Sequence, residues 1–101
     1  MRHFHTTTIG RKRSPVEYSE FLAEPNMSAG IYHLKSGSVD PQQPHKEDEI
    51  YYVLTGRATF TSNEQSTEIT TGSILYVAAE EKHQFHDSVE DLSLLVVFAA
   101  D

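Results

Sequence analysis

The stretch that decides the fold runs from Gly37 to Gly56 and reads GSVDPQQPHKEDEIYYVLTG. It begins with a polar segment that contains two prolines, and it continues into the apolar run Ile50–Leu54. Prolines and glycines mark turns, whereas a short run of β-branched and aromatic residues is typical of a strand. The stretch therefore predicts a loop that leads directly into a buried strand.

The surrounding chain consists of short apolar segments that are separated by turn residues. The breaks contain glycine, proline and asparagine, or runs of charged and small polar residues. Many short strands at even spacing predict an all-β sandwich or barrel. The expected strands span residues 29–35, 49–55, 57–62, 66–70, 73–78, 83–87 and 92–99.

The N-terminal residues give a less definite signal. The segment from Val16 to Ala23 fits two turns of helix with Ser14 as the N-cap, and it fits an extended segment equally well. A chain of 101 residues suits one domain, so we expect a single domain over residues 1–101. Within it, residues 1–28 are expected to form an N-terminal extension or edge segment.

The composition excludes several classes of protein. The chain has no cysteine, which excludes disulfides, thiolate nucleophiles and cysteine-based zinc sites. Its longest apolar run, Leu94 to Ala100, is far shorter than the roughly 20 residues of a membrane span, so no membrane association is expected. The N-terminus lacks the apolar stretch of a signal peptide. We therefore expect a cytoplasmic protein.

The charge is distributed unevenly along the chain. Residues 1–13 hold four basic residues and no acidic residue, and three of the four form the triplet Arg11-Lys12-Arg13. The remaining residues hold 4 basic and 15 acidic side chains, a net charge of −11. A body of this charge repels nucleic acid, so no nucleic-acid partner is expected. The triplet is interpreted as part of a solvated loop.

Two of the expected strands are apolar on both faces. Neither Ile50–Leu54 nor Leu92–Phe98 alternates with polar residues. In a small barrel the outer face of such a strand needs a cover, because large exposed apolar patches are rare on monomers. A second copy of the chain is the simplest cover, so we expect a homodimer. The alternative is an N-terminal segment folded over the same face.

Three residues form a candidate metal site. Glu49 opens a strand and shares a face with Tyr51, and the pattern predicts that this is the interior face. A buried carboxylate is costly unless it is paired or bound to a metal. If the strand that begins at His83 packs nearby, that histidine approaches Glu49 and His45. Two imidazoles and one carboxylate suit Fe(II), Zn, Mn, Co or Ni. On spacing alone, however, a histidine in a loop is usually a surface residue, and an acidic run such as Glu47–Glu49 is usually solvated.

The residues around this site resemble the first motif of the cupin family, G-x5-H-x-H-x3–4-E-x6-G. The stretch 37–56 keeps every spacing, with Gly37, His45, Glu49 and Gly56 at the expected positions. The one departure is Gln43, which stands where the motif has its first histidine.

Residues 72–87 resemble the second cupin motif, G-x5-P-x-G-x2-H-x3-N. Gly72 and His83 keep the expected residue types, whereas Ala78, Glu80 and Asp87 replace the proline, the second glycine and the asparagine. The turn before His83 must therefore form without the usual proline and glycine.

The resemblance implies a double-stranded β-helix, a jelly-roll barrel with a divalent metal inside. Carried over by position, His45, Glu49 and His83 match metal ligands, and Gln43 is either a weaker fourth ligand or is replaced by water. The metal is expected to be Fe, Mn, Ni or Zn. Tyr51 and Phe85 share faces with Glu49 and His83, and are expected to line the pocket.

Three functional hypotheses follow from the site. The first is a metal-dependent enzyme that acts on a small molecule in the barrel, by dioxygenase-, isomerase- or decarboxylase-type chemistry. The second is a non-catalytic module that binds a small ligand, because the fold alone does not determine an activity. The third is a metal-free barrel in which the same side chains form a hydrogen-bonded network.

Overall fold

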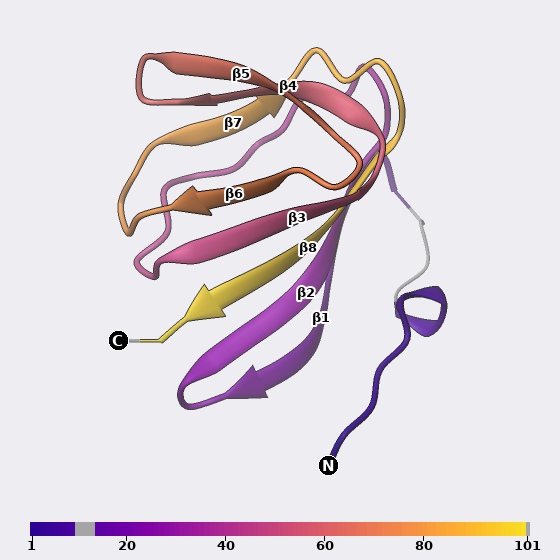
Figure 1. Cartoon of the computed structure of the whole chain (residues 1–101), viewed down its shortest axis with the longest axis vertical. Helices are drawn as coiled ribbons and strands as arrows, with labels where there is room; N and C mark the ends of the chain where they lie inside the picture. The colour runs from indigo at the N-terminus through magenta and orange to yellow at the C-terminus, as the bar shows by residue number, and fades with distance from the viewer. Residues whose placement is uncertain (10–13, 101) are drawn as a thin grey trace.

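The computed structural model describes residues 1–9 and 14–100. Within these residues a short 3-10 turn, Thr6–Thr8, precedes a series of strands (Figure 1). None of the described helical segments is long and apolar enough to cross a membrane. The triplet Arg11-Lys12-Arg13 lies outside the described residues. The strands are β1 (Val16–Glu24), β2 (Met27–Leu34), β3 (Glu49–Thr55), β4 (Arg57–Ser62), β5 (Gln65–Thr70), β6 (Ile74–Val77), β7 (His83–His86) and β8 (Leu92–Ala99).

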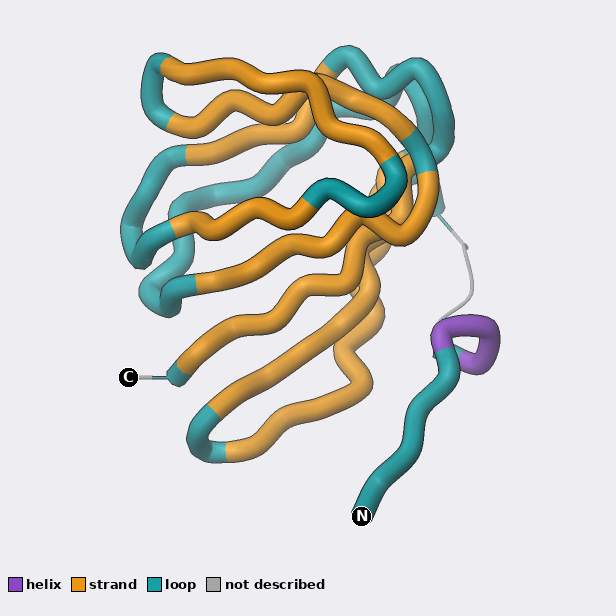
Figure 2. The backbone as a smooth tube through the Cα atoms, viewed as in Figure 1, coloured by secondary structure: helices purple, strands orange, loops and turns teal. Residues whose placement is uncertain are grey.

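The strands form two antiparallel sheets that curl around a shared interior (Figure 2). The larger sheet has the order β1-β2-β8-β3-β6, and the smaller has the order β5-β4-β7. The neighbours β2 and β8, and β3 and β8, are distant in sequence, as in a jelly roll. The predicted all-β fold is confirmed, and each of the expected strands corresponds to an observed one within a few residues.

The core lies between the sheets because alternate side chains of each strand point inward. In β3, Glu49, Tyr51 and Val53 are buried, while Ile50 and Tyr52 face outward and are exposed. This alternation puts the one carboxylate of the strand on the apolar side. The inward residues of the other strands complete the core: Tyr32, Leu34, Ala58, Phe60, Ile69, Val77, Phe85, Leu92, Leu94 and Val96.

The segment that fitted either a helix or an extended chain is β1, at the edge of the larger sheet. It pairs with β2 along its length, with a bulge between Glu20 and Leu22. Tyr18 faces inward over Gly30, where a Cβ atom would collide with the tyrosine ring. The hydrogen bonds to β2 and this close approach favour the extended form over an isolated two-turn helix, which is marginal in water.

The outer face of β3 and β6 carries four of the large exposed apolar side chains of the larger sheet. Ile50 stands opposite Tyr76, and Tyr52 stands opposite Ile74. Ile74 and Tyr76 are 69% and 63% exposed. The described N-terminal residues instead lie against β1 at the far edge of the sheet, where the rings of Phe4 and Phe21 are 5.0 Å apart. In the described part of the chain, the N-terminal segment therefore does not cover this face.

Candidate metal centre

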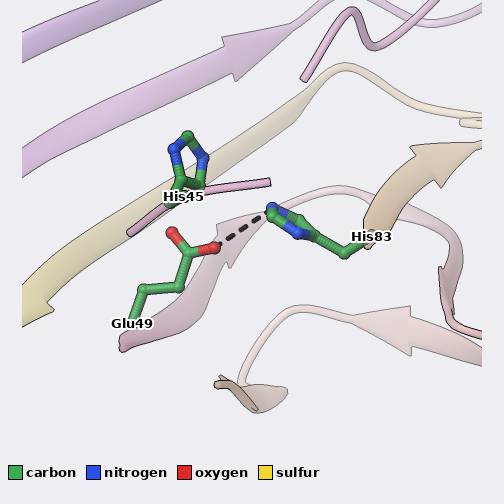
Figure 3. Close-up of side chains that lie close together, drawn as sticks. All are labelled: His45, Glu49 and His83. Atoms are coloured by element: carbon green, nitrogen blue, oxygen red, sulfur yellow. Dashed lines mark ion pairs between the residues drawn. The ribbon is translucent and has the colours of Figure 1, made fainter. Parts of the chain in front are cut away.

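His45, Glu49 and His83 come together inside the barrel (Figure 3). His45 lies in the loop between β2 and β3, Glu49 is the first residue of β3, and His83 is the first residue of β7. One ligand atom of each residue lies within 4.8 Å of the others. Glu49 is 2% exposed and His83 is 4% exposed, whereas His45 is half-buried. The two sheets and the intervening loop thus each contribute one side chain.

The turn before His83 forms without the proline and glycine of the motif. Glu80 takes the left-handed conformation with φ 65°, at the position where the motif has glycine. The turn is anchored to the loop that carries His45, because the backbone N–H of Ala79 donates to Asp48 Oδ1 at 2.8 Å. Hydrogen bonds therefore hold His83 in place where the sequence lacks the usual turn residues.

The tautomer of His83 follows from its backbone contact. Its Nδ1 lies 2.9 Å from the carbonyl oxygen of Glu81, and a carbonyl only accepts, so Nδ1 carries a hydrogen. Nε2 then faces the cluster and lies 3.1 Å from Glu49 Oε1. Burial is the largest influence on the pKa of His83 and acts to lower it. The hydrogen bond to Glu49, the contact with Glu81 and nearby carboxylate charges outweigh burial, and the pKa is raised.

The cluster contains more hydrogen-bond acceptor atoms than hydrogens that can be donated to them. In its neutral form His83 directs the Nε2 lone pair at the Glu49 carboxylate, so the two groups repel each other unless Nε2 is protonated or a metal ion lies between them. The second carboxylate oxygen, Glu49 Oε2, is buried and has no hydrogen-bond partner among the residues that the structure describes. Leaving a buried charged group unpaired is costly. This donor set therefore fits a divalent metal ion, which supplies the missing positive charge.

Tyr51 lies in the middle of the same cluster. Its hydroxyl group is 3.1 Å from Glu49 Oε1, 3.0 Å from His83 Nε2 and 2.7 Å from Gln42 Oε1. One phenolic hydrogen can be donated to only one of these atoms at a time. Burial and the neighbouring carboxylate of Glu49 raise the pKa of Tyr51, so the phenol stays protonated near neutral pH.

The side-chain amide that reaches the cluster belongs to Gln42. Its Oε1 lies 3.3 Å from His45 Nε2 and 3.2 Å from His83 Nε2. Gln43, at the motif's histidine position, is exposed, has no hydrogen bond to the cluster among those of the described residues, and lines a second cavity together with Gln42 and His83. The two-residue spacing from Gln43 to His45 indicates a shared face only in an extended strand, and the loop is not a strand here.

A buried carboxylate, Asp40, stands behind Gln42 and is the other residue that the sequence did not indicate. It is 2% exposed. It accepts hydrogen bonds from the Tyr32 hydroxyl at 2.6 Å, the Phe85 backbone N–H at 2.9 Å and Gln42 Nε2 at 2.8 Å. Asp40 is one acid among fifteen in the sequence, and only the folded loop shows that it is enclosed.

A cavity of about 230 Å³ adjoins the cluster. Its wall is largely aromatic and includes Tyr18, Tyr32, Tyr51 and Phe98, together with His45. Tyr51 thus lines the cavity as well as the cluster. Phe85 lies in the core instead, with its ring 5.0 Å from that of Tyr51 and edge-on to it. Phe85 therefore supports the tyrosine from the side of the core.

His86 lies on the same strand as His83 but on the outer face of the smaller sheet. Its Nε2 is 2.6 Å from the Thr61 hydroxyl, and its Nδ1 is 2.9 Å from Asp87 Oδ2. The side chain points away from the cluster, as expected for a residue three positions after an inward-facing one.

Known proteins share both the sequence pattern and the architecture of this chain. Residues 30–98 match the family described as Cupin domain. The uncharacterized protein SCO3923 of Streptomyces coelicolor is 48% identical over 82 residues, which cover 81% of this chain and 78% of that protein. An RmlC-like cupin protein from Desulfovibrio desulfuricans superposes with a TM-score of 0.83 at 18% identity, covering 98% of this chain and 96% of the other. An RmlC-like cupin with a double-stranded β-helix fold from Methanocaldococcus jannaschii gives a TM-score of 0.77 at 18% identity, covering 90% and 86%. The chain belongs to the cupin family.

Proposed function

We propose that the protein binds one divalent transition metal through His45, Glu49 and His83, and acts on a small, largely apolar molecule in the adjacent cavity. The observation that carries the proposal is the shared wall: the His45 side chain belongs to both the ligand cluster and the cavity. A molecule in the cavity would therefore lie beside the metal.

The donor set restricts the metal. Imidazole and carboxylate ligands without a thiolate suit Fe, Mn, Ni or Zn. When bound, such an ion supplies Lewis-acid polarisation of a substrate oxygen, or activation of O2 if it is iron. The chain's own part is to hold the ligands in a dry interior, with Tyr51 keeping its proton beside them.

The cavity wall restricts the substrate. Among the described residues, those that line the cavity carry no lysine or arginine, and its aromatic side chains dominate. A cavity of about 150 Å³ holds benzene, so 230 Å³ accepts a single substituted ring or a branched aliphatic molecule. A sugar or a carboxylic acid would lose hydrogen bonds to water on entering, which is costly.

A non-catalytic metal-bearing binding module is the second candidate. It is favoured by the engagement of two of the three tyrosine hydroxyls that line the cavity. The hydroxyl of Tyr32 is bound to Asp40, and that of Tyr51 is bound within the cluster. General acid–base catalysis requires a group that is free to exchange a proton with the substrate.

The metal is tested first, by elemental mass spectrometry of protein purified without a histidine tag or chelator. We expect close to one transition metal per chain in the wild type and its loss in His45→Ala and Glu49→Ala. His86→Ala is the matched control and should keep the metal. Wild-type protein without metal, and without thermal stabilisation by any of the four ions, would favour the hydrogen-bonded network instead.

The cavity is tested by ligand-induced thermal shifts with phenols, sugars and short carboxylic acids. We expect shifts with phenols only. Val96→Phe, which fills the cavity wall, should abolish them, whereas Val97→Phe on the next position of the strand should not. Turnover of a bound compound, or oxygen uptake by the iron form, would distinguish the enzyme from the binding module.

We also propose that two copies pair through the outer face of β3 and β6. Ile50, Tyr52, Ile74 and Tyr76 form one patch there, because they stand opposite each other in register. In the described part of the chain, this outer face of β3 and β6 remains exposed to solvent. Burying it against an identical patch removes apolar surface from water on both copies.

A further inference from the structure

We propose that the Oε1 atom of Gln42 is a fourth protein ligand of the metal, and that Asp40 fixes the amide in the orientation that makes it one. This inference rests on the proposed metal site and adds two residues to it. Neither residue occupies a position at which the cupin motif has a ligand.

The distances between the donor atoms support the proposal that Gln42 Oε1 is a ligand. Ligand atoms bound at about 2.0–2.2 Å, with angles near 90–110°, lie about 2.8–3.6 Å from their neighbours. Gln42 Oε1 is 3.3 Å from His45 Nε2 and 3.2 Å from His83 Nε2. His83 Nε2 is 3.1 Å from Glu49 Oε1. The amide oxygen thus lies at the spacing of adjacent ligands from both histidine nitrogens.

The hydrogen bonds of the Gln42 amide support the proposal that Asp40 fixes its orientation. A carboxylate only accepts hydrogen bonds, so the nitrogen end of Gln42 must face Asp40, at 2.8 Å from Oδ2. The backbone N–H of Gln42 also donates to Asp40, to Oδ1 at 3.3 Å. Rotation of the amide by half a turn would bring two oxygen atoms together at Asp40. The oxygen end is therefore held toward the histidines.

Asp40 is itself held in place from two directions. The hydroxyl of Tyr32 in β2 and the backbone N–H of Phe85 in β7 both donate to it. The carboxylate is buried, so these donors satisfy the charge in place of water. Groups that orient a metal ligand from behind act through the ligand and do not touch the ion. Asp40 is accordingly a positioning residue.

Enough electron pairs remain on the amide oxygen for a metal. An amide oxygen has two lone pairs, and the Tyr51 hydroxyl takes one of them at 2.7 Å. The other is free to face the histidines. Amide oxygen is a hard, neutral donor that suits Fe(II), Mn and Zn less strongly than imidazole does. The site therefore keeps four protein ligands although the sequence lacks the first motif histidine.

The two neighbouring glutamines provide a matched test. Cobalt(II) is titrated into metal-free wild type, Gln42→Ala and Gln43→Ala, with a competing chelator to obtain dissociation constants and with the visible spectrum to report coordination. We expect Gln42→Ala to bind cobalt about tenfold or more weakly and to change the spectrum, the scale found when support of a ligand is lost. Gln43→Ala should match the wild type, and circular dichroism checks that both variants fold.

A second measurement needs no variant. Zinc is added to isotopically labelled wild-type protein, and the side-chain amide signals of Gln42 and Gln43, assigned through their backbones, are followed by NMR. We expect the Gln42 signal to shift with saturation at one zinc per chain and the Gln43 signal to stay.

The outcomes separate the two proposals. A wild type that binds cobalt with unchanged affinity after Gln42→Ala, and whose Gln42 amide does not respond to zinc, would overturn this inference and leave the three-residue site intact. A wild type that binds neither ion would overturn both. A loss of affinity in Gln43→Ala alone would show that Gln43, at the motif position, is the fourth ligand instead of Gln42.

Discussion

The backbone N–H of Glu80 donates to the carbonyl oxygen of His45 at 2.6 Å. Glu80 lies in the turn that leads into His83, so this hydrogen bond ties together the two irregular segments that carry the two histidines. The two segments that carry the imidazoles are therefore joined by a backbone contact of the protein itself.

The conformation of Glu80 predicts a stabilising substitution. Its φ of 65° is unfavourable for a residue with a Cβ atom and natural for glycine. Because glycine also gains entropy in the unfolded chain, we expect Glu80→Gly to raise the free energy of unfolding by only about 0.5–1 kcal/mol. Glu80→Ala retains the strain and serves as the control. Urea unfolding of the two variants measures the difference, and equal stabilities would contradict the expectation.

Metal binding should stabilise the folded protein through His83. At a zinc concentration of about 100 times the dissociation constant, the free energy of unfolding should rise by about 2.7 kcal/mol. We expect no such gain in His83→Ala and an undiminished gain in His86→Ala, because His86 bonds Thr61 on the outer face. Thermal or urea unfolding with and without zinc provides the comparison. An equal zinc effect in both variants would place the ion elsewhere.

Replacing Asp40 should weaken metal binding without removing a ligand. In the wild type, Tyr32, Phe85 and Gln42 donate to two carboxylate oxygens of Asp40. The asparagine in Asp40→Asn would offer only one side-chain oxygen as an acceptor. Its N–H2 group would also attract the oxygen end of Gln42 away from the histidines. We expect cobalt affinity to fall by about tenfold. Asp48→Asn, in the same loop and bound to Ala79, is the control for loop disturbance. Isothermal titration gives both constants, and equal losses in the two variants would argue against a specific role of Asp40.

Alkaline pH should destabilise the protein through Tyr18. Burial, followed by the charges of Glu20 and Glu49, raises the pKa of Tyr18 from 10.0 to about 12. Between these values the folded chain keeps a proton that the unfolded chain releases, so stability falls as the pH rises. Subtracting the phenolate absorbance titration of Tyr18→Phe from that of the wild type should give a midpoint near 12. A midpoint at the ordinary tyrosine value would show that Tyr18 is solvated.

The dimer proposal predicts the effect of charge on the outer face of β6. Lysine in place of Ile74 or Tyr76 would place unpaired charges in the proposed interface. We expect sedimentation equilibrium to give a dimer for the wild type and a monomer for Ile74→Lys and Tyr76→Lys. Val89→Lys, at an exposed apolar residue outside this patch, should stay dimeric. A wild type that sediments as a monomer would refute the pairing.

The sequence predicts the barrel well because the strands are short and clearly separated. Turn residues isolate each apolar segment, and two-residue alternation identifies the buried face of β3. That face includes Glu49, and the expected burial of its carboxylate is what pointed to a metal. The grouping of His45 with His83 required the motif resemblance in addition, because periodicity does not determine which strands approach each other.

The amide at the cluster could not be predicted by the same reasoning. Gln42 and Gln43 are adjacent and identical, and alternation has no meaning in an irregular loop. The choice between them is made by Asp40, whose carboxylate draws the nitrogen end of Gln42 inward. A neighbouring carboxylate that selects one of two equal side chains is a tertiary effect. For the same reason, the extended form of β1 is decided by its pairing with β2 and not by its own residues.

The loop that carries Asp40 also protects a sheet from other chains. The strand β7 is an edge of the smaller sheet, and the loop between β2 and β3 passes beside it (Figure 1). Asp40 accepts a hydrogen bond from the Phe85 backbone through its carboxylate and another from the Gln84 side chain through its carbonyl oxygen. Exposed edge strands recruit strands of other molecules and so promote aggregation. Asp40 thus bonds the edge of β7 and orients Gln42 at the same time. We expect variants that free this loop to self-associate through β7.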